Sequence, residues 1–237
     1  VRTLPVRIET IEIKHDVALL RLALPKAPSF AFYAGQYIDL LLPGNISRSY
    51  SIANSPDQEG VLELHIRKRE NGVCSEMIFG AEPKIKEKGI VRVKGPLGTF
   101  TLQKDSDKPI VLLATGTGYA PIRSILLDLI HQNSERQVHF YWGARRQEDL
   151  YALEEAEALI GRLKNAKFSP VLSKPNSDWK GENGYVQNVA AQNYPDLSQY
   201  EVYACGSLAM TESAQSLLTQ KCALPEDAFF CDAFSPA

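Results

Sequence analysis

The sequence has few cysteines and almost no net charge, and each shortage excludes a class of protein. Its four cysteines are Cys74, Cys205, Cys222 and Cys231, none at the close spacing of a zinc ribbon or a plant-type iron–sulfur centre. We therefore expect free thiols and no metal site. With 26 basic and 28 acidic residues, the formal net charge is −2. Such a chain has no general basic field for nucleic acid or an anionic membrane, so we expect neither as a partner.

The sequence also lacks a long hydrophobic run. One of its most apolar segments, Pro109–Ala114, is far shorter than the roughly 20 residues that cross a bilayer. Val1 leads directly into alternating residues, without the apolar stretch of a signal peptide. These features predict a soluble, cytoplasmic protein. The absent initiator methionine suggests processing, or a fragment of a longer protein.

The first hundred residues show the pattern of short strands. Leu62, Leu64 and Ile66 alternate with polar residues, which is the period of a strand with one buried face. Clusters of Pro, Gly, Asn and Asp separate such runs, and many short strands with frequent turns are typical of a small antiparallel barrel or sandwich. We predict an antiparallel β-barrel domain over residues 1–103, because the polar segment after it ends the strand pattern at Pro109.

Residues 104–237 follow a different period, and the length of 237 residues suits two domains. Ile122, Ile125, Leu126 and Leu129 lie on one helical stripe after an apolar strand. The expected strands are 110–114, 138–141, 168–172, 201–204 and 228–231, and the expected helices lie near 122–130, 149–163, 184–191 and 207–220. This alternation predicts an α/β domain with a parallel sheet of Rossmann-like type.

A glycine-rich turn joins the first strand and first helix of this second domain. Gly116-Thr117-Gly118 lets the backbone approach a diphosphate at a helix start, although the third glycine of the usual dinucleotide fingerprint is absent. The alternative is an ordinary tight strand–helix turn. Arg145 and Arg146 follow the second strand, where the adenosine ribose of a dinucleotide usually binds. An arginine there could bind a 2′-phosphate or stack on adenine, and the alternative, which applies to Arg146 in particular, is a solvated loop charge.

The first domain contains two further candidate segments. Arg48-Ser49-Tyr50-Ser51 starts a strand and can present a cation and an aromatic ring on one face. Gly72-Val73-Cys74-Ser75 precedes a short helical stretch and is a second candidate anion site. Two sites of this kind in two domains suggest two nucleotides, or one nucleotide and one flavin.

The order of these motifs along the chain resembles the ferredoxin–NADP reductase superfamily of flavoproteins. The matching motifs are Arg48-x-Tyr50-Ser51, Gly72-x-x-Ser75, Gly95-Pro96-Leu97-Gly98, Gly116-Thr117-Gly118-x-Ala120-Pro121, Cys205-Gly206-x-x-x-Met210 and Asp232-x-Phe234. Six motifs in order cover essentially the whole chain. It looks most like the reductase modules of bacterial oxygenases and CDP-6-deoxyglucoseen reductase. Tyr141-Trp142-Gly143 and the final Asp232-x-Phe234 also resemble bacterial free-flavin reductases.

The resemblance implies an FAD site in the barrel. Arg48 would pair with the FAD phosphate, Tyr50 would pack on the flavin, and Ser51 would hydrogen-bond near flavin N5. The other implied contacts are His65, Ile66 and Arg67 at the flavin edge and ribityl chain, and Gly72, Val73 and Ser75 at the pyrophosphate.

The resemblance also implies an NADH or NADPH site in the second domain. Its implied residues are Gly116 and Thr117 at the pyrophosphate, Cys205 and Gly206 beside the nicotinamide, and Phe234 over the flavin until nicotinamide displaces it. From their positions in the chain, Gly118 in the same turn and Arg145 after the second strand are further candidate coenzyme contacts. Asp232 stands where the family often has Glu, so a proton-relay role is open, as is the choice between NADH and NADPH.

The function that this resemblance implies is an FAD-dependent NAD(P)H reductase, with Ser51, Cys205 and Phe234 closest to the chemistry. It would pass electrons to an iron–sulfur, ferredoxin-type acceptor. The four cysteines cannot hold a plant-type cluster, so we expect that module on a separate protein or on a longer, fused chain. The alternatives are an NAD(P)H:free-flavin reductase and a non-catalytic flavin-binding subunit.

Overall fold

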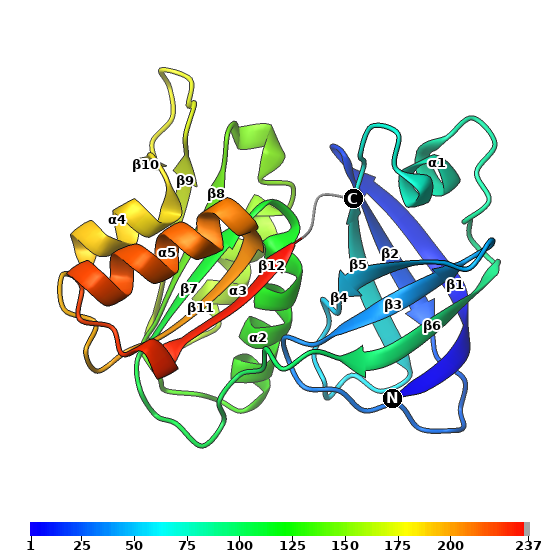
Figure 1. Cartoon of the computed structure of the whole chain (residues 1–237), viewed down its shortest axis with the longest axis horizontal. Coiled ribbons are helices and arrows are strands. Elements are labelled where there is room, and N and C mark those ends of the chain that lie inside the picture. The colour runs from blue at the N-terminus through cyan, green and yellow to red at the C-terminus, as the bar shows by residue number, and fades with distance from the viewer. Residues whose placement is uncertain (235–237) are drawn as a thin grey trace.

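The structure is a computed structural model that describes residues 1–234. It contains two six-stranded sheets that lie side by side (Figure 1). The first sheet is antiparallel, with the order β4-β3-β6-β1-β2-β5. Its strands are β1 (Arg2–Lys14), β2 (Val17–Ala23), β3 (Tyr37–Leu42), β4 (Ile46–Ser51), β5 (Val61–Arg67) and β6 (Ile90–Leu97).

The first sheet curls into the predicted barrel, because its two edge strands approach each other. The segment after β4 pairs with β5 through a bridge between Ile52 and Leu64. Leu62, Leu64 and Ile66 point into the apolar barrel core, as their alternation predicts. The helix α1 (Val73–Phe79) adds Cys74 and Ile78 to the same core.

The second sheet is parallel, with the order β10-β9-β8-β7-β11-β12, so the predicted α/β fold is confirmed. Its strands are β7 (Ile110–Thr115), β8 (Val138–Ala144), β9 (Ala166–Leu172), β10 (Glu182–Asn183), β11 (Glu201–Ser207) and β12 (Phe229–Phe234). Its helices are α2 (Tyr119–His131), α3 (Leu153–Gly161), α4 (Val186–Asn193) and α5 (Leu208–Lys221).

Helices cover both faces of the parallel sheet. Residues of α2 and α3 pack on one face in a core that includes Trp142, and residues of α4 and α5 pack on the other in a core that includes Tyr141. Burial of both faces explains the continuous apolar run of β7, in which Ile110 to Ala114 are all buried. The helix α2 lies on the side of the sheet that faces the barrel (Figure 1).

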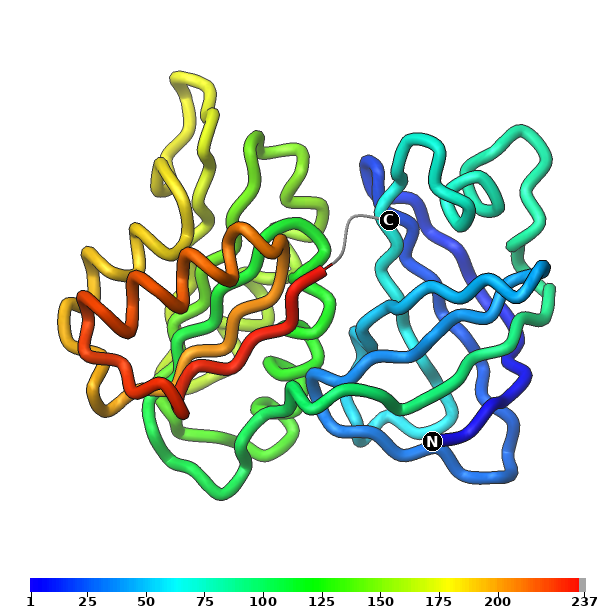
Figure 2. The backbone as a smooth tube through the Cα atoms, viewed as in Figure 1, coloured from blue at the N-terminus to red at the C-terminus, as the bar shows by residue number. Residues whose placement is uncertain are grey.

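Most predicted elements of the second domain differ from the structure by a few residues at their ends, and two of these differences have a clear cause. The helix expected at 149–163 starts only at Leu153, because Leu150 and Tyr151 turn inward and are buried after a 3-10 turn. The last strand, expected at 228–231, continues to Phe234 because it pairs with β11 as far as Ser207. Figure 2 shows this strand, in red, running toward the barrel.

Three further predictions concern the cysteines, the domain boundary and the absence of a membrane span. All four cysteines are free thiols, as predicted. The segment 98–109 joins the last barrel strand to β7, and the boundary at residue 103 stays a prediction. No helix in the described part of the chain is long and apolar enough to cross a bilayer.

Candidate active site

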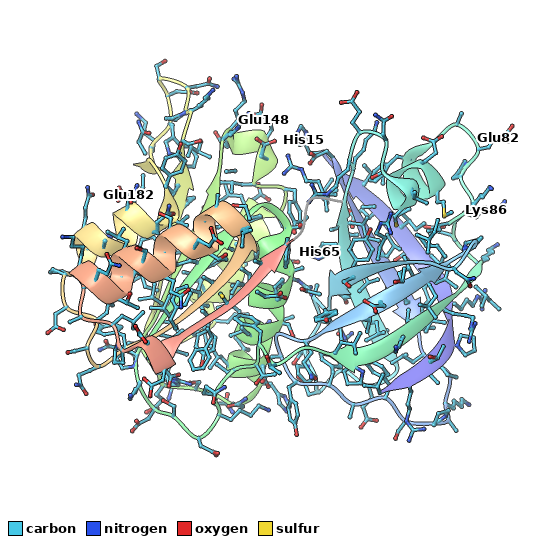
Figure 3. The ribbon with its side chains drawn as sticks, viewed as in Figure 1. His15, His65, Glu82, Lys86, Glu148 and Glu182 are labelled. Atoms are coloured by element: carbon cyan, nitrogen blue, oxygen red, sulfur yellow. The ribbon has the colours of Figure 1, made fainter. Side chains whose placement is uncertain are left out.

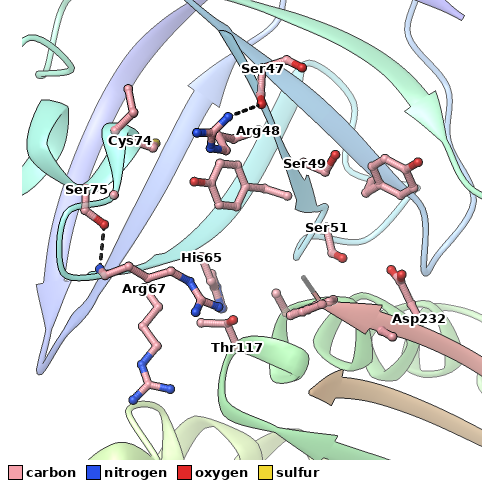
Figure 4. A pocket seen from close by; sticks show the side chains of 18 residues that line it. Ser47, Arg48, Ser49, Ser51, His65, Arg67, Cys74, Ser75, Thr117 and Asp232 are labelled. Carbon is pink, nitrogen blue, oxygen red and sulfur yellow. Dashed lines mark hydrogen bonds between the residues drawn. The ribbon is translucent and has the colours of Figure 1, made fainter. Parts of the chain in front are cut away.

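A cavity of about 480 Å³ opens in the barrel where β4, β5, α1 and the end of β12 meet (Figure 4). The residues that line it include ten of those predicted from the sequence: Arg48, Tyr50, Ser51, His65, Arg67, Gly72, Val73, Ser75, Thr117 and Phe234. The structure therefore brings together residues from both halves of the chain. We call this space the barrel cavity.

One part of the barrel cavity combines a cation with a half-buried aromatic ring. Arg48 donates from Nη1 to the carbonyl oxygen of Ser47 at 2.9 Å. Beside it, burial raises the pKa of the Tyr50 phenol well above its usual value, and Cys74 adds to the shift. The phenol is therefore neutral at every physiological pH. A neutral ring next to a guanidinium suits a ligand with an aromatic part and an anionic part.

The Gly72–Ser75 segment supplies hydrogen-bond donors to the same cavity. Gly72 precedes α1, whose first-turn N–H groups have no partner within the helix. The Ser75 hydroxyl accepts a hydrogen bond of 2.7 Å from the backbone N–H of Arg69, which leaves its own proton free to donate. These donors fit the oxygens of a phosphate group.

Ser51 and Asp232 line the barrel cavity from opposite domains, as Figure 4 shows. Ser51 ends β4 and has an exposed fraction of 7%. Burial raises the pKa of the Asp232 carboxyl to about 6. This carboxyl can therefore gain or lose a proton near neutral pH, which an exposed aspartate does not do.

His65 lies in the wall between the two domains (Figure 3). Its Nδ1 is 2.7 Å from the hydroxyl of Tyr151, a residue that the sequence analysis missed. Burial and, to a smaller extent, the positive charge of Arg123 together lower the pKa of His65 to about 3. The imidazole is therefore neutral at pH 7 and is fixed by a partner from the other domain.

A second cavity, of about 1000 Å³, runs along the carboxyl ends of the parallel strands. We call it the crevice. Of the predicted residues, it is lined by Arg67, Gly116, Thr117, Arg145, Gly206 and Phe234. Gly116 has a φ of +55°, a backbone conformation that glycine adopts without strain, and no Cβ covers the turn there. An open turn at this edge of a parallel sheet is where dinucleotides bind.

Close packing explains why glycine is needed at two of the predicted positions. A Cβ on Gly118 would collide with the carbonyl oxygen of Cys205 on β11, and Gly118 lines neither cavity. A Cβ on Gly206 would collide with the Thr115 hydroxyl. Gly118 is therefore needed for the close packing of the turn on β11, and direct contact with a ligand is not supported.

Two other predicted residues have side chains that line neither cavity. Ile66 points into the barrel core and is 1% exposed, so any contact with a ligand would come from its backbone. Cys205 is fully buried in the core beneath α2. Burial raises the pKa of its thiol well above the usual value, and the Asp232 charge adds to the shift. The thiol is therefore not a nucleophile at pH 7.

The crevice also contains residues that the sequence analysis missed. Gln187, at the start of α4, is 7% exposed and lines the crevice. Its Nε2 donates to the Ser213 hydroxyl at 3.2 Å, whereas its Oε1 has no hydrogen-bond partner within residues 1–234. Lys174 and Tyr185 also line the crevice. A cation, an aromatic ring and an unpaired acceptor together suit a nucleoside with phosphate groups.

The barrel cavity and the crevice meet between the domains. Arg67, Arg69, Thr117 and Phe234 line both. Ligands bound in the two cavities would therefore touch each other at this junction. Such an arrangement defines a class of protein, an oxidoreductase that brings a barrel-bound cofactor against a dinucleotide.

Comparisons with known proteins identify both ligands. Residues 6–102 match the oxidoreductase FAD-binding domain family, and residues 112–216 match the oxidoreductase NAD-binding domain family. The chain is 43% identical, over its whole length and 70% of the relative, to CDP-6-deoxy-L-threo-D-glycero-4-hexulose-3-dehydrase reductase of Yersinia pestis. It is 33% identical to the NAD(P)H-flavin reductase of Vibrio harveyi, over 89% of this chain and 90% of that one.

A solved structure shows the same fold. The cytochrome P450 reductase GcoB of Amycolatopsis superposes with a TM-score of 0.89 at 29% identity, over 99% of this chain and 70% of that one. The chain belongs to the ferredoxin–NADP reductase superfamily. It is an FAD-dependent NAD(P)H oxidoreductase, as the motifs predicted.

Proposed function

We propose that this reductase passes electrons from NADH or NADPH, through FAD, to an iron–sulfur protein of ferredoxin type. The support from relatives is the likeness to the reductase of the CDP-hexulose dehydrase in Yersinia pestis. A second such relative is the reductase component of propane 2-monooxygenase in Rhodococcus jostii, at 34% identity over the whole chain and 64% of the relative. FAD is the chemical basis of the proposal, because it accepts a hydride and can release electrons singly.

In the barrel cavity, we assign Arg48 and the Gly72–Ser75 segment to the FAD phosphates. The Tyr50 ring would pack on the flavin, and the Ser51 hydroxyl would donate near flavin N5. Each assignment follows from a cavity-lining position and from the donor or ring that the residue offers. His65 would contact the flavin as a neutral imidazole, since its pKa of about 3 prevents protonation.

In the crevice, we assign Gly116 and Thr117 to the coenzyme pyrophosphate and Gly206 to the nicotinamide side. Arg145 lies on an exposed loop that lines the far part of the crevice, where it would meet the adenosine end. Phe234 lines both cavities and would cover the flavin face until the nicotinamide replaces it. Cys205 would support this region from below rather than touch the reacting atoms.

The observation that carries the proposal is the separation of two approaches to the barrel cavity. The crevice reaches it from the side of Thr117 and Phe234. On the other side, its wall is the edge strand β4, where Ser47 and Ser49 are exposed. A flavin held there would receive a hydride from the coenzyme on one side and present an edge near the surface on the other. A protein acceptor could then approach without displacing the coenzyme.

A second candidate is a free-flavin reductase, in which flavin is a diffusible substrate. It is supported by the likeness to the Vibrio harveyi enzyme. The phosphate-type donors around Arg48 favour retention of FAD instead. Gel filtration of the purified protein distinguishes the two candidate functions, since only a bound cofactor stays with the protein on the column. We expect about one FAD to stay bound to each chain.

Anaerobic addition of NADH or NADPH then tests the reductase. We expect the flavin absorbance to bleach within seconds. A protein that loses its flavin on the column, yet turns over with added flavin, would support the free-flavin reductase. A retained flavin that neither coenzyme bleaches would contradict both candidates.

A further inference from the structure

One buried arginine connects the two domains next to both cavities. Arg123 lies in α2 with a side-chain exposure of 16%. From the α/β domain it crosses to the barrel, where its Nη1 donates to Glu63 Oε2 at 2.8 Å and to the carbonyl oxygen of Ala53 at 2.9 Å. Its Nε donates to Glu155 Oε1, on α3, at 2.8 Å. Neither cavity is lined by Arg123.

The two barrel partners of Arg123 lie beside residues of the barrel cavity. Ala53 follows Ser51 by two positions, and Glu63 precedes His65 by two positions on β5. Arg123 therefore holds the chain at both walls of the cavity that faces the coenzyme. Its neighbour Ser124 strengthens the contact, because the hydroxyl donates to the carbonyl oxygen of Asn54 at 2.8 Å.

The same arginine is fixed with respect to the crevice. The helix α2 begins at Tyr119, directly after the Gly116–Gly118 turn, whose residues Gly116 and Thr117 line the crevice. Arg123 lies about one helical turn from this start. The Tyr119 hydroxyl donates to the same carboxylate oxygen, Glu155 Oε1, at 2.6 Å. About one turn of helix therefore separates the Gly116–Gly118 turn from the arginine that holds the walls of the barrel cavity.

We propose that Arg123 is a positioning residue for hydride transfer, which fixes the distance between the flavin in the barrel and the nicotinamide in the crevice. This inference rests on the proposed function. Hydride transfer requires donor and acceptor atoms in a narrow range of distance and orientation, and a displacement of about 1 Å can cost about a hundredfold in rate. The contacts of Arg123 cross the domain interface beside the barrel cavity and about one helical turn from the crevice. They therefore control the distance between the flavin and the nicotinamide.

The prediction separates ligand binding from the chemical step. Arg123→Ala removes the bridge but leaves every cavity-lining residue in place, so FAD and coenzyme affinities should change less than about threefold. The rate of flavin reduction at saturating coenzyme should fall at least about tenfold. Arg123→Lys keeps the positive charge, but an ammonium group has fewer hydrogen-bond donors than the planar guanidinium. The Lys variant should therefore reduce flavin faster than the Ala variant and more slowly than the wild type.

The matched control is Arg136, another buried arginine paired with a glutamate. Its Nη2 is 2.9 Å from Glu201 Oε1, and it also donates to backbone carbonyls of the segment 98–109. It lines neither cavity. Arg136→Ala should therefore lower the melting temperature without slowing flavin reduction at saturating coenzyme. Equal slowing by both variants, at equal loss of melting temperature, would show that Arg123 acts only through stability.

Stopped-flow absorbance under anaerobic conditions measures the rate, and titration with oxidised coenzyme measures binding. Hydrogen exchange of the FAD-free protein gives an independent readout, in which Arg123→Ala should speed amide exchange at residues 51–54 and at the start of α2. If Arg123→Ala does not fold, the same rate and exchange measurements on Arg123→Lys test the proposal. Wild-type reduction rate or wild-type exchange in the folded variant overturns the proposal. A wild-type protein that neither coenzyme reduces would instead contradict the proposed function, and the exchange result would still decide whether Arg123 holds the cavity walls.

Discussion

His65 and Tyr151 are joined across the domain interface by a hydrogen bond of 2.7 Å between imidazole Nδ1 and the phenolic hydroxyl. The first residue lines the barrel cavity and the second lines the crevice. Their rings meet edge to face, with centroids 5.5 Å apart. A neutral imidazole that is buried at this junction needs its partner, since an unpaired buried polar group costs free energy.

The first prediction concerns this pair. Tyr151→Phe keeps the ring but leaves the His65 nitrogen without its partner, so the free energy of unfolding should fall by about 1–3 kcal/mol. Urea unfolding followed by circular dichroism measures the change. The control is Tyr33→Phe, because Tyr33 is 64% exposed and its hydroxyl is in water. An equal effect of the two substitutions would contradict a structural role for the hydrogen bond.

The second prediction concerns Arg48. Arg48→Ala removes a charge-assisted contact to the FAD phosphate, worth about 1.5–3 kcal/mol, so FAD should dissociate more than about tenfold more readily. Fluorescence titration of the FAD-free protein measures the affinity. Arg92→Ala is the control, since Arg92 is an exposed barrel arginine that lines neither cavity. Unchanged FAD affinity in Arg48→Ala would remove Arg48 from the site.

The third prediction concerns Ser51. If its hydroxyl donates near flavin N5, Ser51→Ala should keep FAD bound and slow flavin reduction, with a cost of about 2–4 kcal/mol at most in the barrier. Ser49→Ala is the matched control on the same strand, because Ser49 also lines the barrel cavity but its hydroxyl already donates to Asp39 Oδ1 at 2.6 Å. Stopped-flow reduction of the Ser51 variant at the wild-type rate would show that the side chain has no such role.

The sequence predicted the local backbone elements that line the two cavities, while the roles of their residues stay predictions. The strand with Arg48, Tyr50 and Ser51, and the turn with Gly116 and Thr117, each depend on a few adjacent residues. Turn chemistry and strand alternation are local, so they could be read before any long-range contact was known.

The residues that the sequence analysis missed depend on contacts between distant parts of the chain. Tyr151 became a partner of His65 only because the inward turn before α3 faces the barrel. Arg123 lies outside the apolar stripe of its helix, and nothing adjacent to it in the sequence points to its partner Glu63 in the barrel. Gly118 matched a ligand motif, but its position is explained by close packing on β11. Short motifs do not show which of two neighbouring surfaces a side chain will meet.

The fourth prediction is a pH dependence at Asp232. Burial raises the pKa of this carboxyl from 3.8 to about 6. Well below pH 4 the group is protonated in the folded and unfolded states alike, so it causes no difference in stability. Above pH 6 it is ionised in both states, and ionisation is less favourable in the folded protein. Its effect therefore lowers stability as the pH rises from about 4 to about 6.

Asp232→Asn removes this effect, since an amide does not ionise. The free energy of unfolding of the FAD-free protein should increase by about 1–3 kcal/mol at pH 8 and stay nearly unchanged at pH 4. Urea unfolding at the two pH values measures the difference. Asp105→Asn, at an exposed position, should have little effect at either pH. An equal change at pH 4 and pH 8 in the Asp232 variant would show that its carboxyl has an ordinary pKa.

The last prediction concerns the electron acceptor. The four cysteines are at positions 74, 205, 222 and 231, and no group of three or more His, Cys, Asp or Glu residues in the described part of the chain could hold a metal ion. Electrons that leave FAD therefore meet no metal centre in residues 1–234.

Ferricyanide is small enough to approach a flavin whose edge lies near the exposed strand β4, so this chain should reduce it rapidly with NADH or NADPH. Cytochrome c is a much larger oxidant whose haem is mostly enclosed, so its reduction should be slow until a ferredoxin-type protein is added. Steady-state turnover with both oxidants on one preparation tests this, with superoxide dismutase present to suppress reduction through oxygen. Rapid reduction of cytochrome c by this chain alone would show that no iron–sulfur relay is needed.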